Sequence, residues 1–155
     1  MVGVGKEGLE DSLARVTVVN YFGHLLLDAF VAPTQRVIDW RTKYSGIRPA
    51  DLLNPSGTSS YGKTNSAQSF EVVQTRVAEL IKDRILVGHG VQGDLAILKL
   101  SHPREKIRDT ALYEPFRGKY SAGKTPSLKK VVEGELGVTI QSAEHDSVRT
   151  TNESD

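Results

Sequence analysis

Two side chains stand where catalytic groups are often found, Asp94 and His145. Asp94 falls one turn into a predicted helix that follows a predicted buried strand, and sites in α/β sheets form where strands end. His145 lies in the polar segment AEHDS at 143–147. Each also has an ordinary interpretation, because an aspartate in a first helical turn interacts favourably with the helix dipole and a loop histidine is simply exposed. Taken alone, the spacing favours these ordinary interpretations.

Three glycine-rich segments match phosphate-binding patterns. Residues 57–64 (GTSSYGKT) and 118–125 (GKYSAGKT) match the P-loop pattern, but neither follows the buried strand that a P-loop needs. Residues 88–93 (GHGVQG) match G-x-G-x-x-G, and Asp109 follows at about the ~20-residue spacing of dinucleotide sites. A hairpin and a helix precede this segment, which favours a tight strand-to-helix turn. A nucleotide-binding domain using Gly88 to Gly93 is a distant alternative.

The elements that must position these side chains alternate between strands and helices. Two β-branched, apolar segments at 13–20 and 25–31 flank a short connection with Gly23, which predicts an antiparallel hairpin. The pattern at 37–44 leaves helix and loop both open. The later predicted elements are a one-faced helix at 70–81, a buried strand at 85–87, a helix to about residue 100, a strand at 106–110, and a helix that begins at Thr125 and Pro126 and stops at Gly137. This order predicts a mixed α/β fold with a partly parallel sheet.

Length and composition describe one ordinary domain. The chain has 155 residues, and its 20 basic and 19 acidic residues give a net charge of +1. This balance provides no global field to attract nucleic acid or a membrane, although local patches remain open. Zero cysteines exclude disulfides and thiolate metal sites. Neither a membrane span nor a signal peptide is recognised, which predicts a soluble, intracellular protein.

Read continuously, the sequence strongly resembles the RNA exonuclease 4 family of DEDDh-type 3′–5′ exonucleases. The stretches that carry the resemblance, in family order, are MVGVG at 1–5, LARVTVVN at 13–20, DWRTKYSGIRP at 39–49, VAELIKDRILVGHGVQGDL at 77–95, LSHPREKIRDT at 100–110 and SLKKVVEGELGVTIQSAEHDSV at 127–148. The resemblance implies an RNase H-like fold, a mixed sheet flanked by helices. The implied organisation is an exonuclease domain at 1–148, an inserted loop at about 54–69 and a divergent polar tail at 149–155.

The chemistry implied by this resemblance is phosphodiester hydrolysis with two Mg²⁺ or Mn²⁺ ions held by four carboxylates, with a histidine as general base. By resemblance, Asp94 is a metal ligand and His145 is the general base. Met1 and Arg41 match substrate-binding positions, and Asp109 matches a structural aspartate. The implied partner is RNA, with single-stranded DNA as an alternative and no membrane. The implied role is the trimming of ribosomal RNA precursors in the nucleus or nucleolus.

The sequence also departs from the family pattern at both ends. In the family an Asp-x-Glu pair stands just before the methionine that Met1 matches, and an aspartate stands where this chain has Thr150. Asp94 is then the one metal carboxylate left, so we expect this chain by itself to be inactive. We expect the strand ending at residues 1–3 to lie between 13–20 and 85–87, and its incompleteness to weaken the folded state. The alternative function is a non-catalytic relative that binds nucleic acid or a protein partner.

Overall fold

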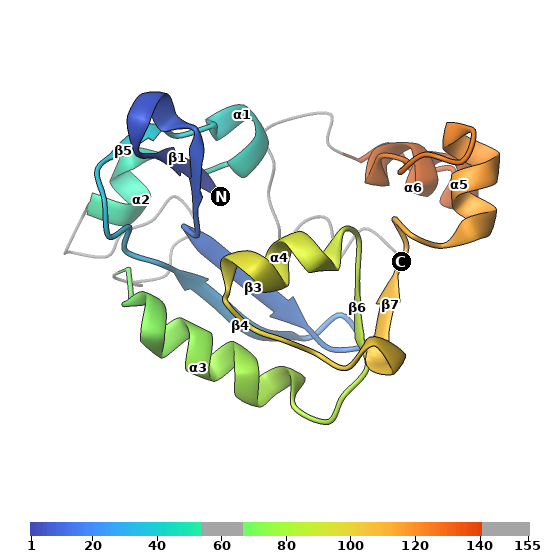
Figure 1. Ribbon diagram of the computed structural model, residues 1–155, viewed down its shortest axis with the longest axis horizontal. Coiled ribbons are helices and arrows are strands. Elements are labelled where there is room, and N and C mark those ends of the chain that lie inside the picture. The colour runs from blue at the N-terminus through green and yellow to red at the C-terminus, as the bar shows by residue number, and fades with distance from the viewer. Residues whose placement is uncertain (54–66, 141–155) are drawn as a thin grey trace. The chain divides into compact units, whose positions relative to one another are not determined.

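The computed structural model describes residues 1–53 and 67–140 (Figure 1). These residues form two units, the first reaching Leu80 and the second beginning at Ile81. Most of the predicted loop at 54–69 and all of the predicted tail at 149–155 lie outside the described residues. The predicted domain boundaries therefore stay predictions.

A three-stranded antiparallel sheet opens the first unit. Its central strand, β1 (Val2–Val4), pairs with β2 (Glu10–Ser12) on one side and with β5 (Val37–Asp39) on the other. The prediction that residues 1–3 pair with 13–20 and 85–87 is therefore wrong for the strand that the structure shows.

The chain reversal between β1 and β2 explains this difference. A 3-10 turn, η1 (Lys6–Gly8), joins the two strands, and Gly5 and Gly8 beside it adopt positive φ angles of 70° and 72°. Glycine enters this left-handed region without the steric cost that a Cβ atom imposes. The reversal is so tight that β2 takes the place beside β1 before the chain reaches residue 13.

The predicted hairpin is confirmed. β3 (Arg15–Val19) and β4 (Leu25–Phe30) pair in antiparallel register, with Arg15 opposite Phe30. The Arg15 guanidinium donates two hydrogen bonds to the Asp28 carboxylate, from Nε at 2.8 Å and from Nη2 at 2.9 Å. Such a two-point pair fixes orientation as well as adding attraction. This charged pair thus links the two strands of the hairpin.

The segment at 37–44, for which the sequence left helix and loop open, also contains a strand. It begins as β5 and, after a left-handed residue at position 41, continues as the one-turn helix α1 (Thr42–Ser45). A further short helix, α2 (Pro49–Leu53), follows. The apolar residues alternate too briefly here for either period to be recognised in the sequence.

The hydrophobic core of the first unit joins its strands to these short helices. Val2, Ala14, Phe30 and Ile47 form one buried cluster, with Val37, Trp40 and Leu52 packed against it. The predicted helix at 70–81 is confirmed as α3 (Phe70–Ile81), and Val73, Val77 and Ile81 are buried along one face. The helical spacing of apolar residues thus identified the buried face correctly.

A parallel strand pair organises the second unit. β6 (Leu86–Gly88) leads into α4 (Val91–Ile97), a 3-10 turn η2 (Arg104–Lys106) follows, and β7 (Ile107–Asp109) returns beside β6. This is a strand–helix–strand unit, which the predicted order requires. β7 lies within the predicted range 106–110, and β6 extends one residue beyond the predicted range 85–87, to Gly88. In Figure 1 the pair and its helix appear in yellow-green to orange.

One property predicted for the β6 segment is wrong, namely its burial. Ile85 and Val87 are 60% and 67% exposed, whereas Leu86 between them is half-buried. Alternate side chains of a strand point to opposite faces, so Ile85 and Val87 share one face of this segment. The apolar run ILV therefore has one exposed side, which composition alone does not distinguish from burial on both sides.

Two helices complete the second unit. α5 (Glu114–Ser121) has no counterpart among the predicted elements, and α6 (Leu128–Leu136) confirms the last predicted helix with its stop at Gly137, where φ is 69°. The predicted start at Thr125 and Pro126 is wrong by two residues. Ser127 is the N-cap, because its hydroxyl accepts a bond from the Lys130 N–H.

Within the described residues, no helix is long and apolar enough to cross a membrane.

The close approach of β1 to η1 makes a first prediction. A Cβ atom at Gly3 would overlap the carbonyl oxygen of Gly8, a backbone atom that cannot move aside cheaply. We expect Gly3→Ala to lower the free energy of unfolding by ~1–3 kcal/mol, the usual cost of overpacking. Gly93→Ala is the matched control, because a Cβ there meets nothing within 4 Å. Urea denaturation that finds the two variants equally stable would contradict the packing described here.

Candidate functional site

The turn between β6 and α4 is held by the Asp109 carboxylate at the end of β7. Asp109 Oδ1 accepts hydrogen bonds from the N–H groups of Gly90 at 2.8 Å and Ala111 at 2.9 Å, and Oδ2 accepts one from Val91 at 3.0 Å. Gly90 is the N-cap of α4 and has a φ of 78°. A carboxylate that accepts several backbone N–H groups at a helix start satisfies donors that the helix itself leaves unpaired. The structural role predicted for Asp109 is what this geometry shows.

This arrangement argues against nucleotide binding at 88–93. A dinucleotide site needs the backbone N–H groups at the helix start free to face a pyrophosphate. Here the N–H groups of Gly90 and Val91 already point at Asp109. The segment is the tight strand-to-helix turn that the sequence favoured.

The geometry also argues against the P-loop match at 118–125. Residues 118–121 belong to the last turn of α5, and the chain beyond it leaves the helix through Ala122, which adopts a φ of 49°. A phosphate loop must precede a helix, whereas this segment ends one, where carbonyl groups rather than N–H groups are unpaired. Residues 57–64 lie outside the described residues.

His89 ties the same turn to the chain before α6. Its Nδ1 lies 2.9 Å from Thr110 Oγ1, and its Nε2 lies 3.0 Å from the carbonyl oxygen of Pro126. The Thr110 hydroxyl also lies 3.1 Å from the carbonyl oxygen of Gly88. The His89 ring thus bonds its own turn and also reaches a residue 37 positions away.

Asp94, the predicted metal ligand, lies in the first turn of α4. Its side chain is exposed, yet partial burial raises the pKa of its carboxyl, and the negative charge of Asp109 adds to the effect. An exposed carboxylate with weakened hydration gains from a cation or a proton close to it.

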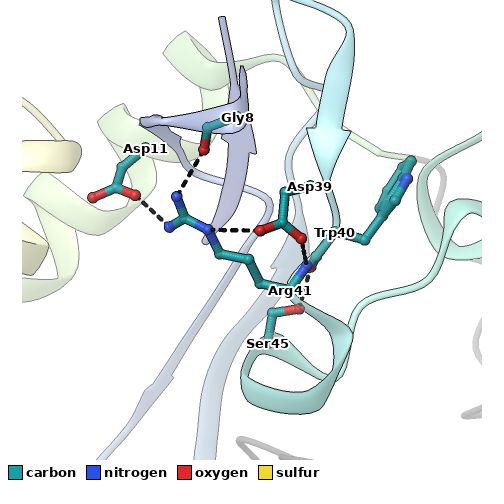
Figure 2. A network of polar contacts seen from close by, with 6 residues as sticks. All are labelled: Gly8, Asp11, Asp39, Trp40, Arg41 and Ser45. Atoms are coloured by element: carbon teal, nitrogen blue, oxygen red, sulfur yellow. Dashed lines mark hydrogen bonds and ion pairs between the residues drawn. The ribbon is translucent and has the colours of Figure 1, made fainter. Parts of the chain in front are cut away.

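Arg41, the predicted substrate contact, is engaged in a polar network in the first unit (Figure 2). Its guanidinium donates to Asp11 of β2 and to the carbonyl oxygen of Gly8 at 3.0 Å, and its Nε lies 3.7 Å from Asp39 Oδ2. The Arg41 N–H donates to Asp39 Oδ1 at 2.9 Å. Ser45 closes the network by donating to the Trp40 carbonyl oxygen at 2.8 Å.

The network explains why a non-glycine residue adopts a left-handed conformation here. Arg41 has a φ of 48°, which costs of order 1–3 kcal/mol in backbone strain unless the surroundings impose it. The Asp39 carboxylate and the start of α1 impose it by fixing the backbone on both sides. Asp11 and Asp39 are partners of Arg41 that the sequence did not reveal; the adjacency of Asp39 in the stretch DWR was the only available signal.

The remaining predicted site residues are His145 and Met1. His145 lies outside the described residues, and its role stays a prediction. Met1 precedes β1 and is partly exposed. Met1 and Arg41 belong to the first unit, whereas Asp94 belongs to the second.

The described residues do not fit a two-ion site by themselves. Within 1–53 and 67–140, no three Asp, Glu, His or Cys side chains lie close enough together to hold one metal ion. Mg²⁺ is bound by oxygen ligands from carboxylates and water, and two such ions need several carboxylates converging on one place. Asp94, by itself, would offer only one such carboxylate.

Residues 11–152 match the family described as Exonuclease (RNase_T), and the chain belongs to this family. The prediction of the RNA exonuclease 4 family is confirmed by curated relatives of that name. The chain is 47% identical to RNA exonuclease 4 of Saccharomyces cerevisiae over 95% of its length, and 45% identical to that of Homo sapiens over 96%. It spans 47% and 32% of these two relatives.

Solved structures confirm the RNase H-like mixed α/β fold. The Pan2 pseudoubiquitin hydrolase-RNA exonuclease module of Saccharomyces cerevisiae matches 96% of this chain with a TM-score of 0.73 and 29% identity. The same module in complex with AACCAA RNA matches with a TM-score of 0.74 and 28% identity. In both cases the match covers about a quarter of the other chain, 24% and 25%.

The Asp109 cluster makes a second prediction. In Asp109→Asn an NH2 group replaces one of the two carboxylate oxygens. A backbone N–H that donated a hydrogen bond to this oxygen then faces another donor and loses its acceptor. We expect a loss of ~1–3 kcal/mol in the free energy of unfolding. Asp83→Asn, which breaks only an exposed contact with Lys106 at 3.3 Å, is the matched control and should cost less than ~1 kcal/mol. Equal denaturant midpoints for the two variants would count against the cluster.

The raised pKa of Asp94 makes a third, pH-dependent prediction. Because the folded state holds this proton more tightly than the unfolded chain, Asp94 favours folding at acid pH, and this contribution is lost as the pH rises through the raised folded pKa. Asp94→Asn does not titrate. The stability of the variant relative to the natural chain should therefore increase from acid to neutral pH, as followed by urea denaturation. A pH-independent or opposite difference would contradict the pKa direction.

Proposed function

We propose that this chain is the exonuclease domain of a 3′–5′ exoribonuclease of the RNA exonuclease 4 type, which trims ribosomal RNA precursors in the nucleus or nucleolus. The observation that carries the proposal is the 45–49% identity to RNA exonuclease 4 over nearly the whole chain. RNA as substrate is supported by the names of these relatives and by the RNA oligonucleotides in complex with the matching Pan2 module. Single-stranded DNA is the second candidate substrate.

In this proposal the reaction uses Mg²⁺ or Mn²⁺, and each predicted residue has one role. Asp94 supplies a carboxylate ligand, consistent with its exposed position and raised pKa. His145 accepts the proton of the attacking water. Arg41 and Met1 lie at the substrate, and Arg41 must exchange at least one of its contacts with Asp11, Gly8 and Asp39 to reach a phosphate.

We further propose that residues 1–155 alone do not hydrolyse RNA. The described residues contain no cluster of three metal-binding side chains, and Thr150 stands where the family pattern has a carboxylate. The same observation favours a second candidate function, a non-catalytic domain that binds RNA or a protein partner. The two candidates differ in whether restored carboxylates restore hydrolysis.

A fourth prediction separates them. The natural chain with Mn²⁺ should leave a 5′-labelled RNA intact. A variant extended before Met1 by an Asp-x-Glu strand, and carrying Thr150→Asp with a helix after it, should shorten the RNA stepwise from its 3′ end. In this variant Asp94→Ala and His145→Ala should each lower the rate at least ~100-fold, the loss typical of one stabilising group.

Two controls make this result interpretable. Asp83→Ala, which changes an exposed carboxylate remote from any predicted role, should leave the rate of the extended variant unchanged. An RNA labelled and blocked at its 3′ end should resist the enzyme. Hydrolysis by the natural chain that depends on Asp94 would overturn the proposed inactivity, and an extended variant that binds RNA without shortening it would favour the non-catalytic function.

A further inference from the structure

A cavity in the second unit is not explained by the exonuclease residues above. It has a volume of about 770 Å³, a size typical of sites for small organic groups. Its walls come from η2, β7 and the start of α5, and Gln92 of α4 contributes at one side. β7 leads directly toward α5 in Figure 1, so most of the cavity is built from one continuous stretch of chain.

The apolar part of this cavity is aromatic and accessible. Tyr113 and Phe116 meet edge to face, with ring centroids 4.9 Å apart and planes at 84°. Tyr113 and the neighbouring Leu112 are 54% and 58% exposed. Phe116 is also 6.2 Å from Tyr120, so α5 carries a row of three rings at successive turns. Ring faces held on a helix are platforms on which flat groups stack, and every nucleobase has such a face.

The polar part of the cavity is positively charged. Arg104 and Arg108 line it, and among the described residues neither guanidinium pairs with a carboxylate. Arg108 Nη1 donates instead to the carbonyl oxygens of Glu105 at 2.8 Å and Ile107 at 3.0 Å, which are neutral acceptors that fix its position. Asp109 is the one acid in the lining, and three backbone N–H groups already bond to its oxygens.

We propose that this cavity binds single-stranded RNA, with a base stacked on Tyr113 and adjacent phosphates bound by Arg104 and Arg108. The charge complementarity between a phosphate backbone and two guanidinium groups that no described carboxylate pairs with favours a nucleic acid over an apolar ligand or a second copy of this chain. The Gln92 side-chain amide, exposed at the rim, offers a donor and an acceptor to a base edge. The site rests on the proposed RNA function and extends it to a contact outside the hydrolytic residues.

The experiment measures binding without hydrolysis. The full chain is titrated, in EDTA, against a fluorescently labelled eight-nucleotide oligouridylate and against an abasic oligomer with the same phosphates. Tyr113→Leu should weaken binding of the oligouridylate about 5- to 100-fold, the range for loss of one stacked base, and leave the abasic oligomer unaffected. Tyr113→Trp should retain binding. In the double variant Arg104→Gln/Arg108→Gln, the slope of log affinity against log salt should fall by about 1.4, or ~0.7 for each phosphate.

Matched controls lie in the first unit. Tyr21→Leu removes another exposed ring, and Arg36→Gln removes another exposed charge; both should bind like the natural chain. Natural chain that binds neither oligomer overturns the proposed RNA function together with this site. Binding that the cavity variants leave unchanged, or that Tyr113→Leu weakens equally for both oligomers, overturns the stacking site alone. Self-association that is lost in Tyr113→Leu, with no effect on RNA, would assign the cavity to a second copy and overturn the proposal.

Discussion

The second unit depends on one carboxylate. Asp109 stands at the end of β7, and its two oxygens hold the N–H groups of Gly90, Val91 and Ala111. These bonds join the end of one strand to the turn that leaves its neighbour, so β6, β7 and α4 acquire a common geometry. Removing this acceptor would leave the N–H groups of the buried residues Val91 and Ala111 unpaired, which is costly in the protein interior. The direction in which α4 leaves the sheet, and with it the place of Asp94, follows from this cluster.

A similar network holds the first unit together, but its central group is positively charged. There a cation, Arg41, is the centre, and its acceptors come from β2, from η1 and from the end of β5. An arginine can satisfy several acceptors at once because its guanidinium presents donors in fixed directions. The network holds three segments of the small sheet and also stabilises a backbone conformation that Arg41 would not adopt alone. A phosphate bound by Arg41 would compete with these carboxylates, so such binding would be coupled to the stability of the sheet.

The parts of this fold that the sequence predicts are those governed by local periodicity. The hairpin around Gly23 and the buried face of α3 follow from alternation and helical spacing, which need no distant partner. The pairing of β1, the exposed face of Ile85 and Val87, and the partners of Arg41 depend on which segments meet in space. No pattern within a few residues of Asp11 indicates that it binds an arginine 30 positions away. Asp109 was recognised only through family resemblance, since a lone aspartate after a strand has many possible partners.

The bonds of His89 imply a fixed assignment of hydrogens at the turn. The Pro126 carbonyl can only accept, so Nε2 carries a hydrogen. In the neutral ring Nδ1 must then accept, and the single hydrogen of the Thr110 hydroxyl is directed to it rather than to the Gly88 carbonyl. The Gly88 carbonyl keeps its hydrogen bond from the Thr110 N–H at 2.9 Å. Thr110 therefore ties both sides of the turn, bonding Gly88 through its backbone and the His89 ring through its side chain.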